Sequence, residues 1–134
     1  MVSVPIFLGS AAAAALVNGW LIARTGSLRR KLKISVGDGG NEALLRRMRA
    51  QGNFLETTPF FLLLVLGLEL FGANRVGLGA VAALFILARI SHGIGMEGGD
   101  KARWRMYGMM GTTLPTAVLI VWAAAKLVEL GLGR

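Results

Sequence analysis

The sequence predicts an all-α integral membrane protein, built as a bundle of four transmembrane helices that run alternately up and down through the bilayer. Hydrophobic residues make up 54% of its 134 residues and charged residues only 16%, whereas soluble domains carry about 25% charged residues. Two uncharged segments, 4–23 and 106–125, have the length of about 20 residues that a helix needs to cross a bilayer core. The basic residues gather in the connections between apolar segments, which is the pattern of the positive-inside rule.

The chain is expected to form a single domain, residues 1–134, with helices at about 4–23, 41–71, 76–95 and 105–130. The first apolar segment has no charge before Arg24, so it lacks the basic start of a cleaved signal peptide and is predicted to be a membrane helix. The polar stretch from Arg24 to Gly40 is expected to connect the first two helices. Its end, "GDGGN", signals a turn, and Asn41 is placed to cap the second helix.

The positive charge of the chain is concentrated beside the first two apolar segments. More than half of its 15 lysines and arginines lie between or next to them: Arg24, Arg29, Arg30, Lys31, Lys33, Arg46, Arg47 and Arg49. The net charge of +8 is also typical of nucleic-acid-binding proteins, but clustering beside membrane spans indicates topology. We therefore expect membrane lipids and no nucleic acid as partners, with both termini outside and the basic loops in the cytoplasm.

The residue types narrow the chemistry further. The sequence contains no cysteine, which excludes disulfides, thiolate nucleophiles and cysteine-based metal sites. Its single histidine, His92, has no partners at metal-ligand spacing, so no metal is expected.

The second helix carries polar side chains into the membrane boundary. Its uncharged core, 57–68, is too short to span a bilayer, so Asn53 and Glu56 lie at or inside the boundary. Arg49, Asn53 and Glu56 are spaced i, i+4 and i+7, which places them on one helical face. This row suits a small zwitterionic ligand with carboxylates and an amine. The alternatives are that the arginines reach lipid phosphates and that Glu56 pairs with a basic residue of a neighbouring helix.

The third and fourth helices add a second group of candidates near the same end. Arg89, His92 and Met96 share one face of the third helix. His92 is either a general base or a histidine that packs between helices. Arg103 and Arg105, where the fourth helix starts, provide cationic donors for an anion or a thiolate, or else they are solvated topology signals.

Further features of these helices concern packing and the opposite end of the bundle. Gly108 and Gly111 are expected to allow close helix packing. Glu69, Lys126 and Glu129 are expected at the interface on the far side of the membrane.

The stretch "RAQGNFLETTPFF", residues 49–61, resembles the signature of the MAPEG proteins, the membrane-associated proteins in eicosanoid and glutathione metabolism. The family has an Arg-Ala-Gln/His-x-Asn-x-x-Glu-x-x-Pro run at the start of its second helix, and it is matched here by Arg49, Ala50, Gln51, Asn53, Glu56 and Pro59. Supporting pieces are "LRRKLKIS", "VGDGGN", "LARISHGIGM" and "RMYGMMGTT". The resemblance covers nearly the whole chain, and its details are similar to the bacterial branch of the family.

The resemblance implies a MAPEG-like homotrimer in a bacterial inner membrane, with glutathione as cosubstrate between neighbouring subunits. Arg105, or else Arg103, would lower the pKa of the glutathione thiol and hold the thiolate. That thiolate would attack a lipophilic electrophile from the bilayer, as in a glutathione transferase or peroxidase. Either Arg29 or Arg30 would contribute to glutathione binding, together with the expected binding residues Arg49, Gln51, Asn53, Glu56, Arg89 and His92.

The sequence departs from the family at the tyrosines that contact glutathione. On the third helix their positions are taken by His92 and Met96, and the residue after Glu56 is Thr57; the only tyrosine is Tyr107. These departures keep open a non-catalytic protein of the same fold that binds a lipid or another amphipathic anion. A proton-coupled transporter is disfavoured, because the chain shows no inverted repeat.

Overall fold

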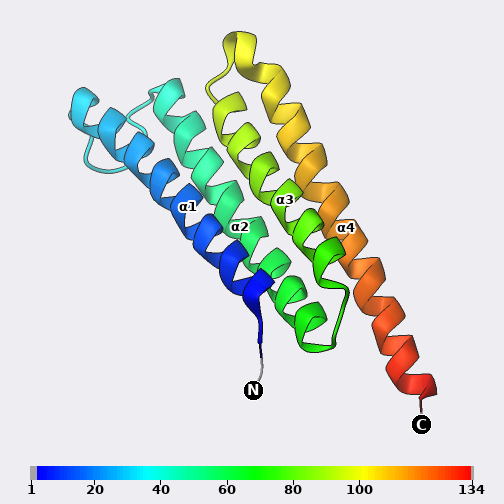
Figure 1. Ribbon diagram of the computed structural model, residues 1–134. Helices are drawn as coiled ribbons and strands as arrows, with labels where there is room; N and C mark the ends of the chain where they lie inside the picture. Colours follow the sequence, from blue (N-terminus) through cyan, green and yellow to red (C-terminus); the bar gives the residue numbers. More distant parts are fainter. Residues whose placement is uncertain (1–2, 134) are drawn as a thin grey trace.

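The computed structural model describes residues 3–133, and they form four long antiparallel helices that lie side by side (Figure 1). Each helix is long and apolar enough to cross a membrane, and residues 3–133 contain no strand. The predicted all-α bundle of four transmembrane helices is therefore confirmed. A short 3-10 helix, η1, precedes the last of the four, and the order is α1 (Pro5–Leu32), α2 (Glu42–Leu70), α3 (Arg75–Gly95), η1 (Gly99–Lys101) and α4 (Ala102–Leu132).

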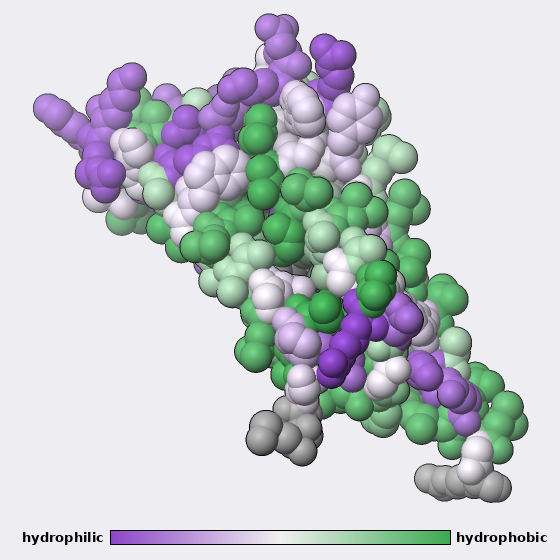
Figure 2. Space-filling model, in the orientation of Figure 1, coloured by the Kyte–Doolittle hydropathy of each residue, from purple (hydrophilic) through white to green (hydrophobic). Residues whose placement is uncertain are grey.

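The α1–α2 and α3–α4 connections lie at one end of the bundle, at the top of Figure 1. Most hydrophilic residues gather at this end, whereas apolar side chains cover the middle of the surface (Figure 2). We call it the basic end, because it carries the lysines and arginines of both connections. The large apolar side chains that face outward, such as Leu16, Phe60 and Val121, are those that a bilayer would surround.

The first helix is longer than the predicted 4–23. α1 continues through Arg24 to Leu32 and ends where Lys33 adopts a left-handed conformation, with φ of 57°. Hydropathy marks where lipid contact ends, and a helix can continue beyond that point. Here the basic residues of the last turn favour helix, because cations at a C-terminus interact well with the helix dipole. Arg24 is also tied to α3, since its Nη1 donates to the carbonyl oxygen of Gly93 at 3.1 Å.

The predicted cap of the second helix is present. The side-chain oxygen of Asn41 accepts a hydrogen bond from the backbone N–H of Leu44 at 3.0 Å. This bond satisfies one of the N–H groups that have no partner inside the helix. It sets where α2 begins, and so sets the face on which the polar row of this helix lies.

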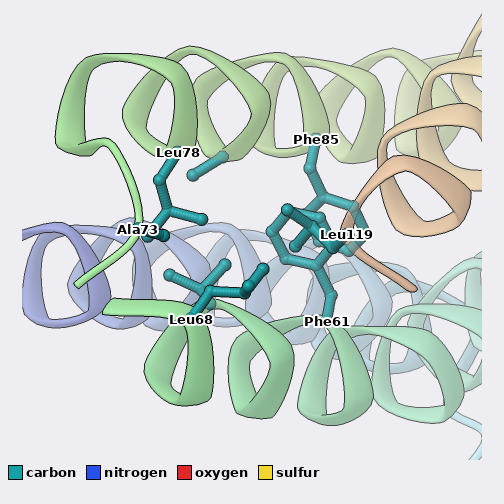
Figure 3. Close-up of a cluster of buried hydrophobic side chains, with 8 residues drawn as sticks. Phe61, Leu68, Ala73, Leu78, Phe85 and Leu119 are labelled. Atoms are coloured by element: carbon teal, nitrogen blue, oxygen red, sulfur yellow. The ribbon is translucent and has the colours of Figure 1, made fainter. Parts of the chain in front are cut away.

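Two clusters of buried apolar side chains hold the helices together. In the first, shown in Figure 3, the rings of Phe61 and Phe85 stack with centroids 3.7 Å apart, and Leu119 joins them from α4. The second lies between α1 and α2, nearer the basic end, and includes Leu21 and Phe54. Side chains from all four helices therefore contribute to a continuous interior, and burial of such side chains contributes about 1.5–3 kcal/mol each in water.

Glu69, near the end of α2 opposite the basic end, is buried, with 6% of its surface exposed. Its two carboxylate oxygens accept hydrogen bonds from the backbone N–H groups of Ile6 at 3.0 Å and Phe7 at 2.7 Å. These groups belong to the first turn of α1, whose own N-cap, Val4, offers no side-chain hydrogen bond. A carboxylate here satisfies unpaired donors and interacts favourably with the helix dipole. Glu69 thus fixes the start of α1 against the end of α2.

Candidate functional site

A cavity of about 540 Å³ opens between α2, α3 and α4 near the basic end. Its size is in the range of about 300–1,000 Å³ that is usual for small-molecule sites. Most of its polar lining was predicted from the sequence, and the lining residues are Met48, Arg49, Gly52, Asn53, Glu56, His92, Met96, Arg105 and Met109.

The α2 wall of the cavity is the polar row of the second helix. Arg49, Asn53 and Glu56 all line the cavity, because residues three and four apart stand on one helical face. Among residues 3–133, no ion pair involves Arg49 or Glu56, and the side chains of Arg49, Asn53 and Glu56 make no hydrogen bond. The guanidinium, the amide and the carboxylate are therefore all available to a ligand.

The threonine at the family's tyrosine position does not face this cavity. The hydroxyl of Thr57 donates to the backbone carbonyl of Asn53 on its own helix at 2.8 Å. Serine and threonine commonly satisfy their hydroxyls in this way inside helices. Thr57 therefore supplies no side-chain donor to the site.

Glycines set how closely α4 approaches α3 beside the cavity. A Cβ atom on Gly95 would lie 2.0 Å from the backbone nitrogen of Arg105, and one on Gly108 would lie 2.4 Å from that of His92. Only glycine allows these approaches. They place Arg105 and His92, from two different helices, in the wall of the same cavity, and the predicted close packing at Gly108 is confirmed.

His92 differs from the other polar groups of the site because it is almost fully buried, with 4% of its surface exposed. Its Nδ1 is buried and has no hydrogen-bond partner in the described part of the chain. Buried polar atoms are usually paired. His92 also lines the cavity, but its Nδ1 has almost no accessible surface of its own.

Arg105 is exposed in the first turn of α4, and no salt bridge or side-chain hydrogen bond involves it within residues 3–133. α4 continues directly from η1, and the backbone N–H of Ala102 at its start donates to the carbonyl oxygen of Gly99. Arg105 also lines a second opening of about 850 Å³, together with Met106 and Met110. Arg105 therefore stands where the cavity meets a second groove, which is rich in methionine and is also lined by Glu42 and Arg46.

Arg89 is not in the lining of the cavity, although it was expected to contact the ligand. It is 1% exposed, its Nη1 donates to the hydroxyl of Thr112 at 3.2 Å, and its guanidinium lies 5.6 Å from the ring centre of Phe54. Its place one turn before His92 on α3 directs it into the bundle interior, where α2 and α4 cover it.

Four other predicted residues also lie outside the cavity lining of the single chain. Gln51 lies beside Gly52 on α2 but is not itself in the lining, and Arg103 lies two positions before Arg105, on another face of α4. On α1, Arg30 is exposed, and Arg29 donates to the carbonyl of Ser35 and to the sulfur of Met48, each at 3.3 Å.

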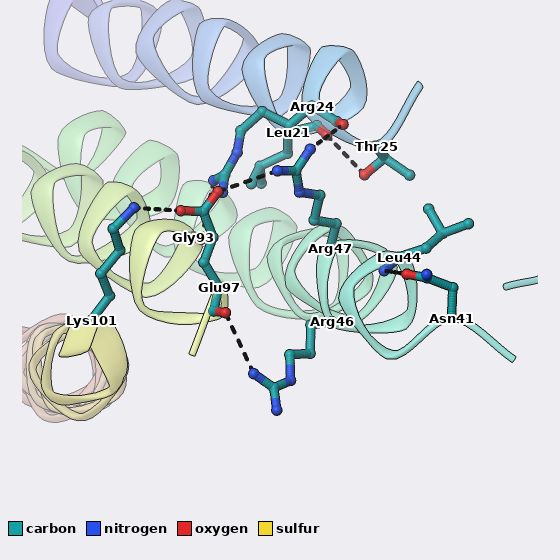
Figure 4. A network of polar contacts seen from close by, with 10 residues as sticks. All are labelled: Leu21, Arg24, Thr25, Asn41, Leu44, Arg46, Arg47, Gly93, Glu97 and Lys101. Atoms are coloured by element: carbon teal, nitrogen blue, oxygen red, sulfur yellow. Dashed lines mark hydrogen bonds and ion pairs between the residues drawn. The ribbon is translucent and has the colours of Figure 1, made fainter. Parts of the chain in front are cut away.

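Glu97 is a structural residue that the sequence analysis missed. Its carboxylate pairs with Arg24 of α1, with Arg47 of α2 at 3.4 Å and with Lys101 of η1 at 2.7 Å, and its backbone carbonyl accepts from Arg46 (Figure 4). The hydrogen bond from Lys101, followed by that from Arg24, holds the pKa of Glu97 below its ordinary value. This network ties α1 and α2 to the turn that leads to Arg105. The available signal was a carboxylate in a glycine-rich turn among basic residues.

The comparisons with known proteins identify the family of the chain. The model of the MAPEG family matches residues 7–125, a range that includes every residue lining the cavity. The inner membrane protein YecN of Escherichia coli is 28% identical over 94 residues, which cover 70% of this chain and 71% of that protein, and YecN from a second strain of the same species gives the same values. The chain belongs to the MAPEG family of membrane proteins.

Proposed function

We propose that the chain is a membrane-bound, glutathione-dependent transferase or peroxidase that acts on lipophilic electrophiles. The observation that carries this proposal is the cavity in which Arg49, Asn53, Glu56 and Arg105 meet without partners among the described residues. Membership of a family linked to glutathione and eicosanoid metabolism supports the choice of ligand.

The polar groups of the cavity fit glutathione, which carries two carboxylates, one ammonium, two amides and a thiol. The guanidinium of Arg49 offers the paired donors that suit a carboxylate. Glu56 offers an acceptor for the ammonium, and the side-chain amide of Asn53 can serve the peptide groups.

Arg105 is the proposed catalytic residue. The thiol of glutathione would release its proton to water, and the guanidinium would hold the sulfur anion by electrostatic stabilisation. In the transferase reaction a sulfur–carbon bond forms while the bond from that carbon to its leaving group breaks. In the peroxidase reaction the sulfur attacks a hydroperoxide oxygen, an alcohol leaves, and a second glutathione completes the reduction to the disulfide and water.

The neighbouring groove supports a lipophilic second substrate. It shares Met96, Arg105 and Met109 with the cavity, so an apolar molecule there would lie next to the proposed thiolate. Methionine side chains adapt to ligands of irregular shape.

The proposal includes a homotrimer, a single domain over 1–134 and an orientation with both termini outside the cytoplasm. In such an assembly the glutathione site would be shared between subunits. Gln51, with Arg29 or Arg30, would then contact glutathione from a neighbouring subunit, although these residues do not line the cavity of their own chain. The concentration of basic residues at one end supports placing that end in the cytoplasm. The name of the YecN relative, an inner membrane protein, supports the bacterial inner membrane.

A second candidate function is binding of a lipid or amphipathic anion without catalysis. It is favoured by the methionines Met48, Met96 and Met109 in the cavity wall, since the family's glutathione-contacting tyrosines are absent there. Both functions use the same cationic groups and differ in whether a thiol is bound.

Calorimetry on the purified protein in lipid nanodiscs tests the proposal. We expect glutathione to bind, and Arg49→Ala to weaken binding about tenfold, the loss of about 1.4 kcal/mol. Arg75→Ala is the matched control, because Arg75 is an exposed arginine at the opposite end of the bundle. Conjugation to a hydrophobic electrophile should require Arg105. Absence of both glutathione binding and turnover would overturn the proposal. Binding of an anionic lipid that added glutathione does not displace would favour the second function.

A further inference from the structure

Arg89 is a positive charge in the bundle interior for which residues 3–133 provide no carboxylate within ion-pair distance. Arginine stays protonated in proteins, and a buried charge without a counter-ion is costly. Its contacts are a single hydrogen bond to Thr112 and the face of Phe54, and its Nε is buried without a partner. These contacts hold the guanidinium in place but do not neutralise it.

The contacts of Arg89 place it directly behind the wall of the candidate site. Phe54 follows Asn53, which lines the cavity, and Thr112 lies three residues after Met109, which also lines it. Arg89 itself precedes His92, a third lining residue, by three positions. On each of the three helices, Arg89 or the residue that it contacts is thus within three positions of a residue that lines the cavity.

We propose that Arg89 acts through its charge, without contacting the ligand, to favour the anionic form of a thiol bound in the cavity. This inference rests on the proposed function and goes beyond it, since Arg105 is the residue that contacts the sulfur there. The proton of the thiol leaves to water, and no oxidant or reductant takes part. The other charged or titratable groups facing the same cavity are Arg49 and Glu56 on α2, His92 on α3 and Arg105 on α4.

The expected effect follows from Coulomb's law. In general, at an effective dielectric constant of about 20, one positive charge about 8 Å from a thiol would lower the pKa of that thiol by about 1.5. Part of this effect is lost to screening at the open side of the cavity. We expect that removal of the charge raises the pKa of bound glutathione by about 1 and lowers turnover about tenfold at a pH below that pKa.

The experiment measures the ultraviolet absorbance of the bound thiolate and, at saturating glutathione, the pH dependence of kcat/KM for the electrophile. Both are measured for the wild type and a set of variants in nanodiscs. Arg89→Met and Arg89→Gln remove the charge, and the glutamine can still donate to Thr112 if the methionine variant does not fold. Arg89→Lys keeps the charge. Thr112→Val is the matched control, since it removes the hydrogen bond of Arg89 and leaves its charge in place.

Arg89→Met and Arg89→Gln, the neutral variants, should move the thiol pKa in both pH profiles to a higher pH. Arg89→Lys and Thr112→Val should lower thermal stability but leave the two profiles near those of the wild type. A purely structural role predicts loss of stability in all four variants with unchanged profiles, and that result would overturn this inference. Glutathione affinity is measured for every protein by calorimetry. Failure of the wild type to bind glutathione removes the proposed function itself, whereas binding with an unchanged thiol pKa in the neutral variants removes only the role of Arg89.

Discussion

Replacing Gly95 with alanine should misplace the arginine proposed to hold the sulfur. The new Cβ would lie 2.0 Å from the backbone nitrogen of Arg105, and ordinary contact starts at 3.4 Å, so the start of α4 must move by about 1.4 Å. The atom it meets belongs to a helix backbone and cannot rotate away. Overpacking of this kind costs about 1–3 kcal/mol of stability, and a displacement of about 1 Å at a reacting group can lower the rate about 100-fold.

The assay compares kcat/KM for glutathione conjugation, glutathione affinity and thermal unfolding in the wild type and in Gly95→Ala. We expect kcat to fall by one to two powers of ten, by the estimate of about 100-fold per 1 Å, with a smaller loss of affinity. Gly19→Ala is the control, because a Cβ on this helical glycine has no atom within 4 Å. Wild-type kinetics and wild-type stability in Gly95→Ala would show that α3 and α4 are not packed as described, and would refute the reasoning.

Two further predictions concern the ends of the bundle. Glu69→Gln should lower the free energy of unfolding by about 1–3 kcal/mol, since a charge-assisted hydrogen bond to an N–H of α1 is lost. Unfolding in denaturing detergent measures this change, and an unchanged midpoint would contradict the capping of α1 by Glu69. Glu97→Gln should remove the part of the pH dependence of stability that Glu97 contributes. Because the pKa of Glu97 is lowered in the folded protein by Lys101 and then Arg24, its contribution is complete above its ordinary value of 4.5 and is lost as the pH falls through the lowered pKa. Melting temperatures are measured between pH 3 and pH 7. As the pH falls through the acidic range, the melting temperature should fall less for the variant than for the wild type. Parallel curves of melting temperature against pH would exclude the network in Figure 4.

Much of the fold could be predicted because the bilayer imposes a local rule. A spanning helix satisfies its backbone within one segment, so hydropathy and charge along the chain were enough to find the four helices. The α2 side of the site was also local, since Arg49, Asn53 and Glu56 share a face through helical periodicity alone. Helix ends were less predictable, because α1 runs beyond its apolar segment to Leu32.

The sequence by itself determined the membrane bundle, the family resemblance and the polar row on α2, because each depends on neighbours within a few helical turns. Only the tertiary structure decided that His92 and Arg105 join that row while Arg89 lies behind it. It also decided that Glu97 and Glu69 each tie together helices far apart in the sequence. These outcomes depend on how closely two helix backbones approach and how they are rotated, and residues such as Gly95 and Gly108 set both.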